Sequence, residues 1–171
     1  MNVSGILFYV ARAARFSLVV CAVYGICRAV FLAVRREKPD LRHEAARLLA
    51  IGYLAALTEI IALRGGMGTT RKLRLVPLDT LRRTFEAGPW QFIYNLVGNI
   101  LWFVPLGMLL HRKKLLCAAS IGAAVSVLLE TLQWLMRTGI TDIDDVIINA
   151  LGTLAGAILM RELNKFRKRN V

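Results

Sequence analysis

Acidic and amide side chains gather near the ends of the long apolar segments of this chain. Ionisable groups inside apolar spans are costly and usually serve a function. We therefore predict that these side chains line a polar, ligand-binding pocket. The residues concerned are Asn95, Asn99, Glu130, Gln133, Asp142, Asp144, Asp145 and Asn149.

Helical spacing places several of these side chains on common faces. Glu130 and Gln133 lie three residues apart, and Asp145 and Asn149 lie four apart, so each pair shares one face of a helix. Asp144 departs from the second of these stripes. A structural role is the alternative, because buried amides and carboxyls also hydrogen-bond between helices.

The carboxyl groups of Glu130, Asp142 and Asp145 are candidate ligands for a metal ion. Mg²⁺ and Ca²⁺ prefer oxygen ligands, and a bound metal could activate water against a lipid-linked phosphate. No nucleophile–base pair stands beside these residues, and no His or Cys lies near them. The leading hypothesis is therefore a binding protein, and the alternative hypothesis is a metal-dependent membrane enzyme.

The apolar segments that carry these groups predict an all-α, polytopic transmembrane helical bundle with about five spans. Hydrophobic residues make up 57% of the 171 residues, more than a soluble domain carries. Each segment is close to the ~20 residues that a helix needs to cross a bilayer. The predicted spans are residues 16–34, 44–63, 92–110, 115–136 and 142–160.

The connections between the segments differ in length. Residues 64–91 form a long connection with several glycines and prolines, whereas residues 138–141 are predicted as a tight turn. We divide the chain into an N-terminal extra helix with its hairpin (1–44), a four-helix membrane domain (45–160) and a basic tail (161–171).

The chain has 23 Lys and Arg residues against 11 Asp and Glu residues, a formal net charge of +12. Most of the basic residues lie between apolar segments, where they orient spans, so we do not expect a nucleic-acid partner. The larger share of them falls inside if the N-terminus is outside, and cytoplasmic loops carry the excess of Lys and Arg. The predicted location is thus a bacterial cell membrane, crossed several times, with the N-terminus out and the C-terminus in.

With this orientation, the polar residues gather near the outer face, and the long connection lies over them. Arg74 and Arg82 in that connection are candidate contacts for lipid or phosphate, because a guanidinium binds phosphate oxygens in pairs. The alternative is that these cations have no ligand, because long loops cross the membrane during insertion regardless of their charge.

The order and spacing of the polar motifs resemble the VanZ-like family of bacterial envelope proteins. The resemblance covers about residues 45–160, and Leu75-Val-Pro77-Leu78 resembles a further family element, with Arg74 and Leu78 in place of Asn and Phe. The motifs that carry the resemblance are Asn95-Leu-Val-Gly-Asn99, Pro105-Leu-Gly107, Glu130-Thr-Leu-Gln133, Thr141-Asp-Ile-Asp-Asp-Val146, Asn149 and Gly152.

The resemblance implies a membrane protein linked to low-level glycopeptide (teicoplanin) resistance, and it implies no established reaction. With the pocket predicted above, it favours a protein that binds membrane lipid, a cell-wall lipid intermediate, a glycopeptide-related ligand or a partner protein. The sequence does not define the oligomeric state.

Overall fold

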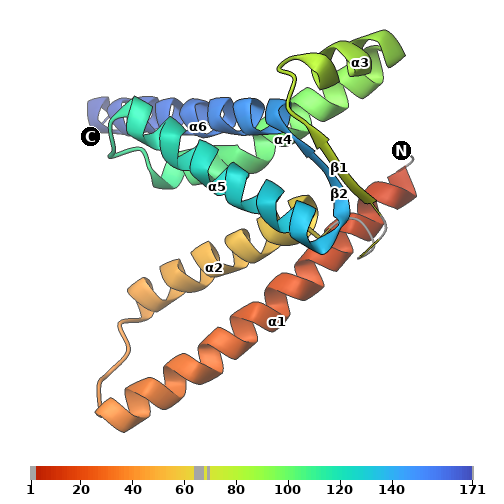
Figure 1. Cartoon of the computed structure of the whole chain (residues 1–171). Helices are drawn as coiled ribbons and strands as arrows, with labels where there is room; N and C mark the ends of the chain where they lie inside the picture. The colour runs from red at the N-terminus through yellow and green to blue at the C-terminus, as the bar shows by residue number, and fades with distance from the viewer. Residues whose placement is uncertain (1–2, 64–67, 69, 171) are drawn as a thin grey trace. The chain divides into compact units, whose positions relative to one another are not determined.

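The computed structural model of the chain describes residues 3–63, 68 and 70–170 (Figure 1). The chain divides into two compact units, unit 1 (Met1–Met67) and unit 2 (Gly68–Val171). Long helices dominate both units, as the sequence predicts, and two short strands in unit 2 complete the described structure.

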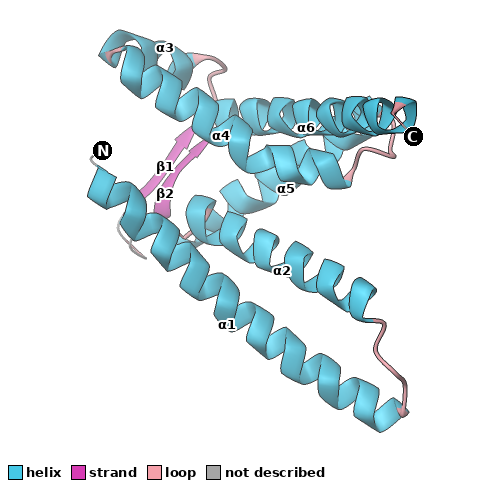
Figure 2. Ribbon diagram, turned by 180° about the vertical axis from the view of Figure 1, so that it is seen from behind, coloured by secondary structure: helices cyan, strands magenta, loops and turns pink. Residues whose placement is uncertain are grey.

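Unit 1 is a helical hairpin. Its two helices, α1 (Val3–Arg35) and α2 (Leu41–Ile61), run in opposite directions and pack against each other (Figures 1 and 2). Asp40 caps α2, since its carboxylate accepts the backbone N–H groups of Arg42 and His43 at 3.0 and 3.2 Å. The side-chain hydrogen bond with His43 also lowers the pKa of Asp40.

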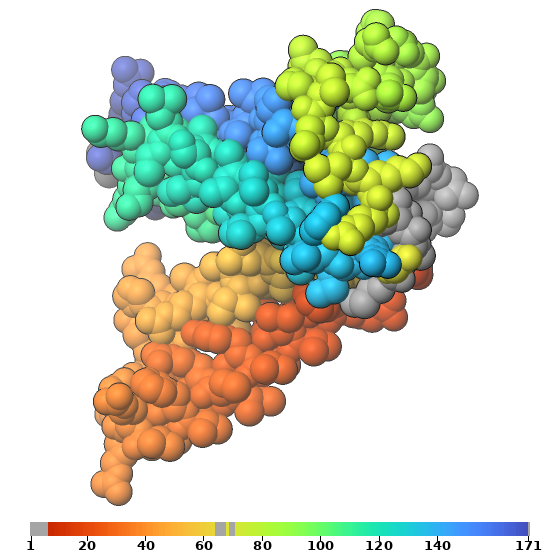
Figure 3. All heavy atoms as spheres, in the orientation of Figure 1, coloured from red at the N-terminus to blue at the C-terminus, as the bar shows by residue number. Residues whose placement is uncertain are grey.

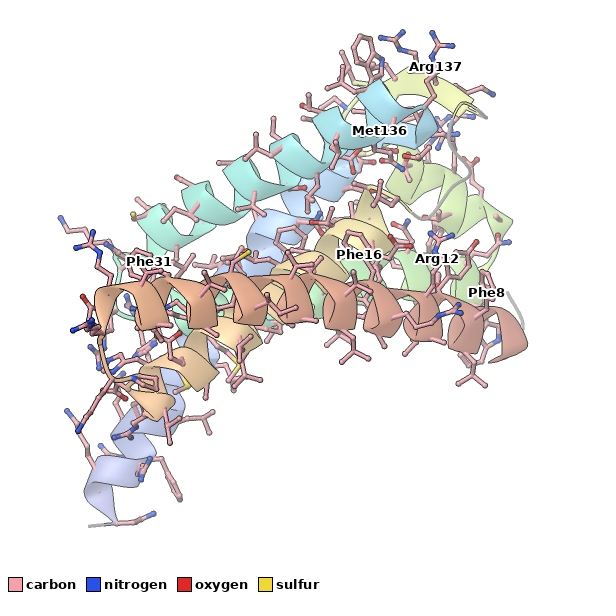
Figure 4. All side chains as sticks on the ribbon, turned by 90° about the horizontal axis from the view of Figure 1, so that it is seen from below. Phe8, Arg12, Phe16, Phe31, Met136 and Arg137 are labelled. Atoms are coloured by element: carbon pink, nitrogen blue, oxygen red, sulfur yellow. The ribbon has the colours of Figure 1, made fainter. Side chains whose placement is uncertain are left out.

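Polar contacts cross this hairpin at intervals. The contacts are an ion pair of Arg12 with Glu59, a 3.0 Å hydrogen bond from Ser17 Oγ to the Gly52 carbonyl, and a 2.9 Å ion pair of Arg28 with Glu44. The two arginines (Arg12 is labelled in Figure 4) are about 24 Å apart along α1 at ~1.5 Å per residue. The carboxylates of α2 are therefore neutralised by α1, one near each end of the hairpin.

Unit 2 is built on three long helices, α4 (Pro89–Leu109), α5 (Leu115–Met136) and α6 (Ile143–Arg169). Helix α6 packs against both of the others. We call the end of unit 2 at which α4 and α6 begin and α5 ends the polar end, because the amide and carboxyl groups of the sequence motifs lie there.

Two glycines let α6 approach the backbone of α4. A Cβ atom added to Gly152 would lie 2.5 Å from the Ile100 carbonyl oxygen, and one added to Gly156 would overlap the Val104 carbonyl. Both added atoms would stand far closer than van der Waals contact allows. Dispersion attraction between closely approaching backbones is a main source of helix association in membranes, so these glycines fix the α4–α6 interface.

A parallel strand pair lies at the polar end. Strand β1 (Thr70–Arg74) pairs with β2 (Thr138–Asp142), with Arg71 opposite Gly139. The predicted tight turn at residues 138–141 is thus a strand, and the long connection contains β1 together with a short helix, α3 (Asp79–Ala87). The strand partners are separated by two long helices, so no local pattern reveals their pairing.

Four described helices are long and apolar enough to cross a membrane: α1 from Leu7, α4, α5 and α6. Helix α2 has comparable length but carries more charge, and it falls outside this set. The fold class predicted from the sequence, an all-α transmembrane bundle, is confirmed.

The close approach at Gly156 predicts a position-specific cost. Gly156→Ala is expected to lower the free energy of unfolding by about 1–3 kcal/mol, because the added methyl forces α6 away from α4. Gly98→Ala on α4 is the matched control, since its Cβ would meet nothing within 4 Å. Thermal unfolding of the purified protein in detergent measures both, and equal melting temperatures for the two variants would contradict this account of the interface.

Candidate functional site

Asp144 joins the start of α6 to the start of α3. Its Oδ1 accepts the backbone N–H of Leu78 at 2.5 Å, and its Oδ2 accepts those of Thr80 and Leu81 at 2.9 and 3.1 Å. The carboxylate is fully buried, with 0% exposure. The first N–H groups of a helix lack partners within that helix, so Asp144 caps α3 from a different helix.

Asp142 makes the second link between the same elements. Its Oδ1 accepts the Asp144 N–H at 3.0 Å, which caps α6, and its Oδ2 accepts the hydroxyl of Thr80. Arg74 lies beside this pair, with its Nη1 atom 3.9 Å from Asp142 Oδ2 and 3.3 Å from Thr80 Oγ1. The Arg74–Leu78 element of the sequence and the aspartate motif of α6 are therefore one structural unit.

Glu130 and Gln133 hold β2 against the end of α5. Glu130 Oε2 accepts the Asp142 N–H at 3.0 Å, and the Glu130 carbonyl accepts the Thr141 hydroxyl at 3.1 Å. A side chain at Gly139 would collide with the amide of Gln133. Gly139 thus leaves room for the Gln133 side chain where β2 crosses it.

The amide residues connect α6 to its two neighbours. Asn99 on α4 donates to Asp145 Oδ1 at 2.7 Å, and Asn149 donates to Ser126 Oγ on α5 at 2.8 Å. The buried Oδ1 atoms of Asn95 and Asn149 have no hydrogen-bond donor among the described residues. These two oxygens can still accept a hydrogen bond from a ligand.

Apart from Arg74, the basic residues of β1 and α3 lie outside this buried network. The Arg71 guanidinium lies 3.5 Å above the centre of the Trp134 ring, a cation–π contact at the end of α5. Arg82 is exposed and lies 3.5 Å from Glu86. Arg83 donates to Asp79 at 2.8 Å, and this hydrogen bond lowers the pKa of Asp79.

Figure 4 shows Met136 and Arg137 where α5 ends. Arg137 adopts a left-handed backbone conformation (φ 55°), and its N–H caps the Gln133 and Trp134 carbonyls. This turn directs the chain into β2.

The carboxylates predicted as metal ligands have different partners. Glu130 and Asp142 accept protein N–H and O–H groups, with 3% and 4% exposure, and Asp145 accepts Asn99. Within residues 3–63, 68 and 70–170, no three His, Cys, Asp or Glu side chains converge as a metal site. In the described residues, these three carboxylates therefore do not form a common oxygen site for Mg²⁺ or Ca²⁺.

The structure therefore brings the predicted residues to one end of unit 2, in two groups. Glu130, Asp142 and Asp144 form a continuous chain of contacts, while Asn99, Asn149 and Asp145 lie between α6 and the neighbouring helices. Sequence reasoning missed Thr80, whose backbone and hydroxyl both contact the aspartates, and the contact of Arg71 with Trp134. The Arg74–Leu78 element, which ends two residues before Thr80, was the only sign in the sequence that this segment belongs to the site.

Spanning helices with a buried polar network at one end define a helical membrane protein. Residues 47–164 match the VanZ/LLP1 family, and the chain belongs to that family. No curated protein and no solved structure matches the chain.

Loss of the Asp144 cap is expected to release α3. In Asp144→Ala, the N–H groups of Leu78, Thr80 and Leu81 lose their acceptor, at a cost of about 1.5–3 kcal/mol for hydrogen bonds to a charged group. Hydrogen exchange of the 78–84 amides should accelerate by at least about tenfold, since ~1.4 kcal/mol is a factor of ten.

The matched control for this experiment is Glu86→Ala, which removes an exposed carboxylate from the same helix. It should leave exchange at residues 78–81 unchanged. Unaltered exchange in Asp144→Ala would show that this carboxylate does not hold α3.

Proposed function

We propose that this member of the VanZ/LLP1 family binds the phosphate of an anionic lipid or a lipid-linked cell-wall intermediate at the outer surface of the bacterial membrane. The site comprises the cations of β1 and α3, which Asp142 and Asp144 hold in place. The observation that carries the proposal is the separation of charge: the carboxylates of Glu130, Asp142 and Asp144 are buried and hydrogen-bonded, whereas the side chains of Arg71 and Lys72 are exposed.

Arg71 is suited to an anionic ligand. Its guanidinium lies over the Trp134 ring, which restricts the side chain without using its N–H groups. A planar guanidinium binds phosphate through two parallel hydrogen bonds. Across residues 70–170, neither Arg71 nor Lys72 has a carboxylate partner, so both remain available to a ligand.

Arg74 and Arg82, the cations predicted from the sequence, extend the same surface. Arg74 is anchored by Thr80 and Asp142. The Arg82–Glu86 pair is exposed, and exposed ion pairs contribute little. The phosphate of a bound lipid can therefore replace Glu86 as the partner of Arg82 at small cost, while Arg74 supplies a fixed positive charge.

The strand pair supports a topology for the chain. Because β1 and β2 are hydrogen-bonded, they lie on the same side of the membrane, and an even number of crossings separates them. Helices α4 and α5 supply two. We propose five spans with the N-terminus outside, in which α2 crosses as the second limb of the α1–α2 hairpin and the strands lie outside.

Cysteine labelling tests the topology. In a chain whose natural cysteines are replaced, Lys113→Cys and Lys168→Cys are expected to resist an impermeant maleimide in intact cells and to react after permeabilisation. Lys72→Cys on β1 should react in intact cells. Labelling of the first two positions in intact cells would overturn the proposed orientation.

Removing cations from the proposed site should weaken phosphate binding. Arg71→Ala with Arg82→Ala, and separately Arg74→Ala with Arg82→Ala, are expected to reduce binding to phosphatidylglycerol or a polyprenyl phosphate. The loss should be about tenfold or more for each pair, since a hydrogen bond to a charged group contributes about 1.5–3 kcal/mol. Binding of the purified protein to labelled lipid is measured across a salt series.

The matched control is Arg167→Ala with Lys168→Ala, which removes two cations from the other end of α6. It should leave binding at the polar end unchanged. Melting temperatures confirm that each variant is folded. If the parent and both site variants bind lipid equally at every salt concentration, the proposed site is wrong. The exposed cations would then be present only because a long loop can cross the membrane whatever its charge.

A link to glycopeptide resistance is part of the same proposal, supported by the family to which the chain belongs. A protein that holds a phosphate-bearing cell-wall lipid at the outer surface would act where glycopeptides bind. The Arg71–Arg82 variant should then lose any decrease in teicoplanin susceptibility that the parent chain provides on expression in a susceptible host.

A further inference from the structure

Large apolar side chains are exposed along the connection that precedes α4. They project from the loop after β1, from α3 and from the first turn of α4 (yellow to green in Figure 3). We call this surface the apolar rim, and its members are 61–83% exposed: Leu75, Val76, Leu78, Phe85 and Trp90. Single exposed apolar residues are common, but a group of them on a non-spanning segment marks an interaction surface.

The length of α4 fixes the depth of this surface. Its 21 residues reach about 31 Å at ~1.5 Å per residue, barely the ~30 Å of a hydrocarbon core. Its first turn must therefore stand at the bilayer boundary. Helix α3 packs beside this turn (Figures 1 and 2), with the rings of Phe85 and Phe92 5.7 Å apart, so α3 lies at the same depth.

Helix α3 has the two faces of an interfacial helix. Leu78, Leu81 and Phe85 follow one another at three- and four-residue intervals on one side, and Arg82, Arg83 and Glu86 are exposed on the other. Amphipathic helices with basic polar faces lie in the plane of the interface, with their apolar side in the boundary of the acyl chains.

The attachment of α3 keeps the rim in a defined position. Asp144 holds its N-terminus through three backbone N–H groups, and Gly88 alone separates it from α4. An apolar surface that is fixed at the membrane boundary can enter the bilayer without the ordering cost of a flexible loop.

We propose that the apolar rim inserts into the headgroup and upper acyl region of the leaflet at which α4 and α6 begin. The occupant of this surface is lipid: the neighbouring cations match an anionic leaflet, and the rim is continuous with the start of a spanning helix. This insertion does not depend on the phosphate binding proposed above, because apolar side chains also enter an uncharged bilayer.

Depth-dependent quenching tests the insertion in the full chain. Val76→Cys and Phe85→Cys carry an environment-sensitive fluorophore in a background without the natural cysteines, and Glu86→Cys is the control on the polar face of α3. Each protein is placed in nanodiscs of phosphatidylcholine, with or without phosphatidylglycerol. Quenchers are a lipid spin-labelled near the top of its acyl chain and aqueous iodide.

Probes at positions 76 and 85 are expected to be quenched by the lipid label at least about twofold more than the probe at 86, with the reverse order for iodide, in both lipid mixtures. Equal iodide quenching at all three positions would overturn the proposal. Protection from both quenchers would also overturn it, since protein would then cover the rim. Lipid quenching confined to the anionic mixture would reject apolar insertion while supporting phosphate binding.

Discussion

The carboxylate of Asp144 accepts three backbone N–H groups from the beginning of α3, and the arrangement of the polar end depends on this contact. Without this contact the three N–H groups would lose their acceptor, and for the buried Thr80 N–H the loss of a partner costs about 1–3 kcal/mol. The contact places Thr80 against Asp142. Asp142 in turn caps α6 and donates its own N–H to the Glu130 carboxylate. The buried carboxylate of Asp144 thus helps to fix the loop after β1, the starts of α3 and α6, and strand β2.

The remainder of the fold follows a related rule, in which polar groups within apolar surroundings find partners inside the protein. In unit 1, the acidic groups of α2 pair with arginines of α1 at both ends of the hairpin. In unit 2, glycines on α6 remove side chains where its backbone meets that of α4. Ion pairs therefore join the first two helices, whereas steric fit and amide hydrogen bonds join the last three.

Local patterns in the sequence identify the helices but not the partners of their polar groups. The span predicted at residues 115–136 coincides with α5, because continuous apolar character defines a spanning helix. The position of Asp144, off the stripe shared by Asp145 and Asn149, was also visible. Its partners were not, since backbone N–H groups of α3 have no side-chain pattern and lie more than sixty residues earlier. The pairing of β1 with β2 was hidden for the same reason.

The parallel pairing of β1 and β2 determines the order in which the chain can be assembled. Strand β1 is complete at Arg74, but its partner ends at Asp142, after two further long helices. At about 5–20 residues per second, synthesis of the intervening segment takes on the order of 3–14 seconds. During that interval β1 and the start of α3 lack the strand and the carboxylates that hold them. The polar end can therefore form only after the start of α6 has been synthesised. A chain whose synthesis stops before α6 lacks Asp144 and cannot form the polar end.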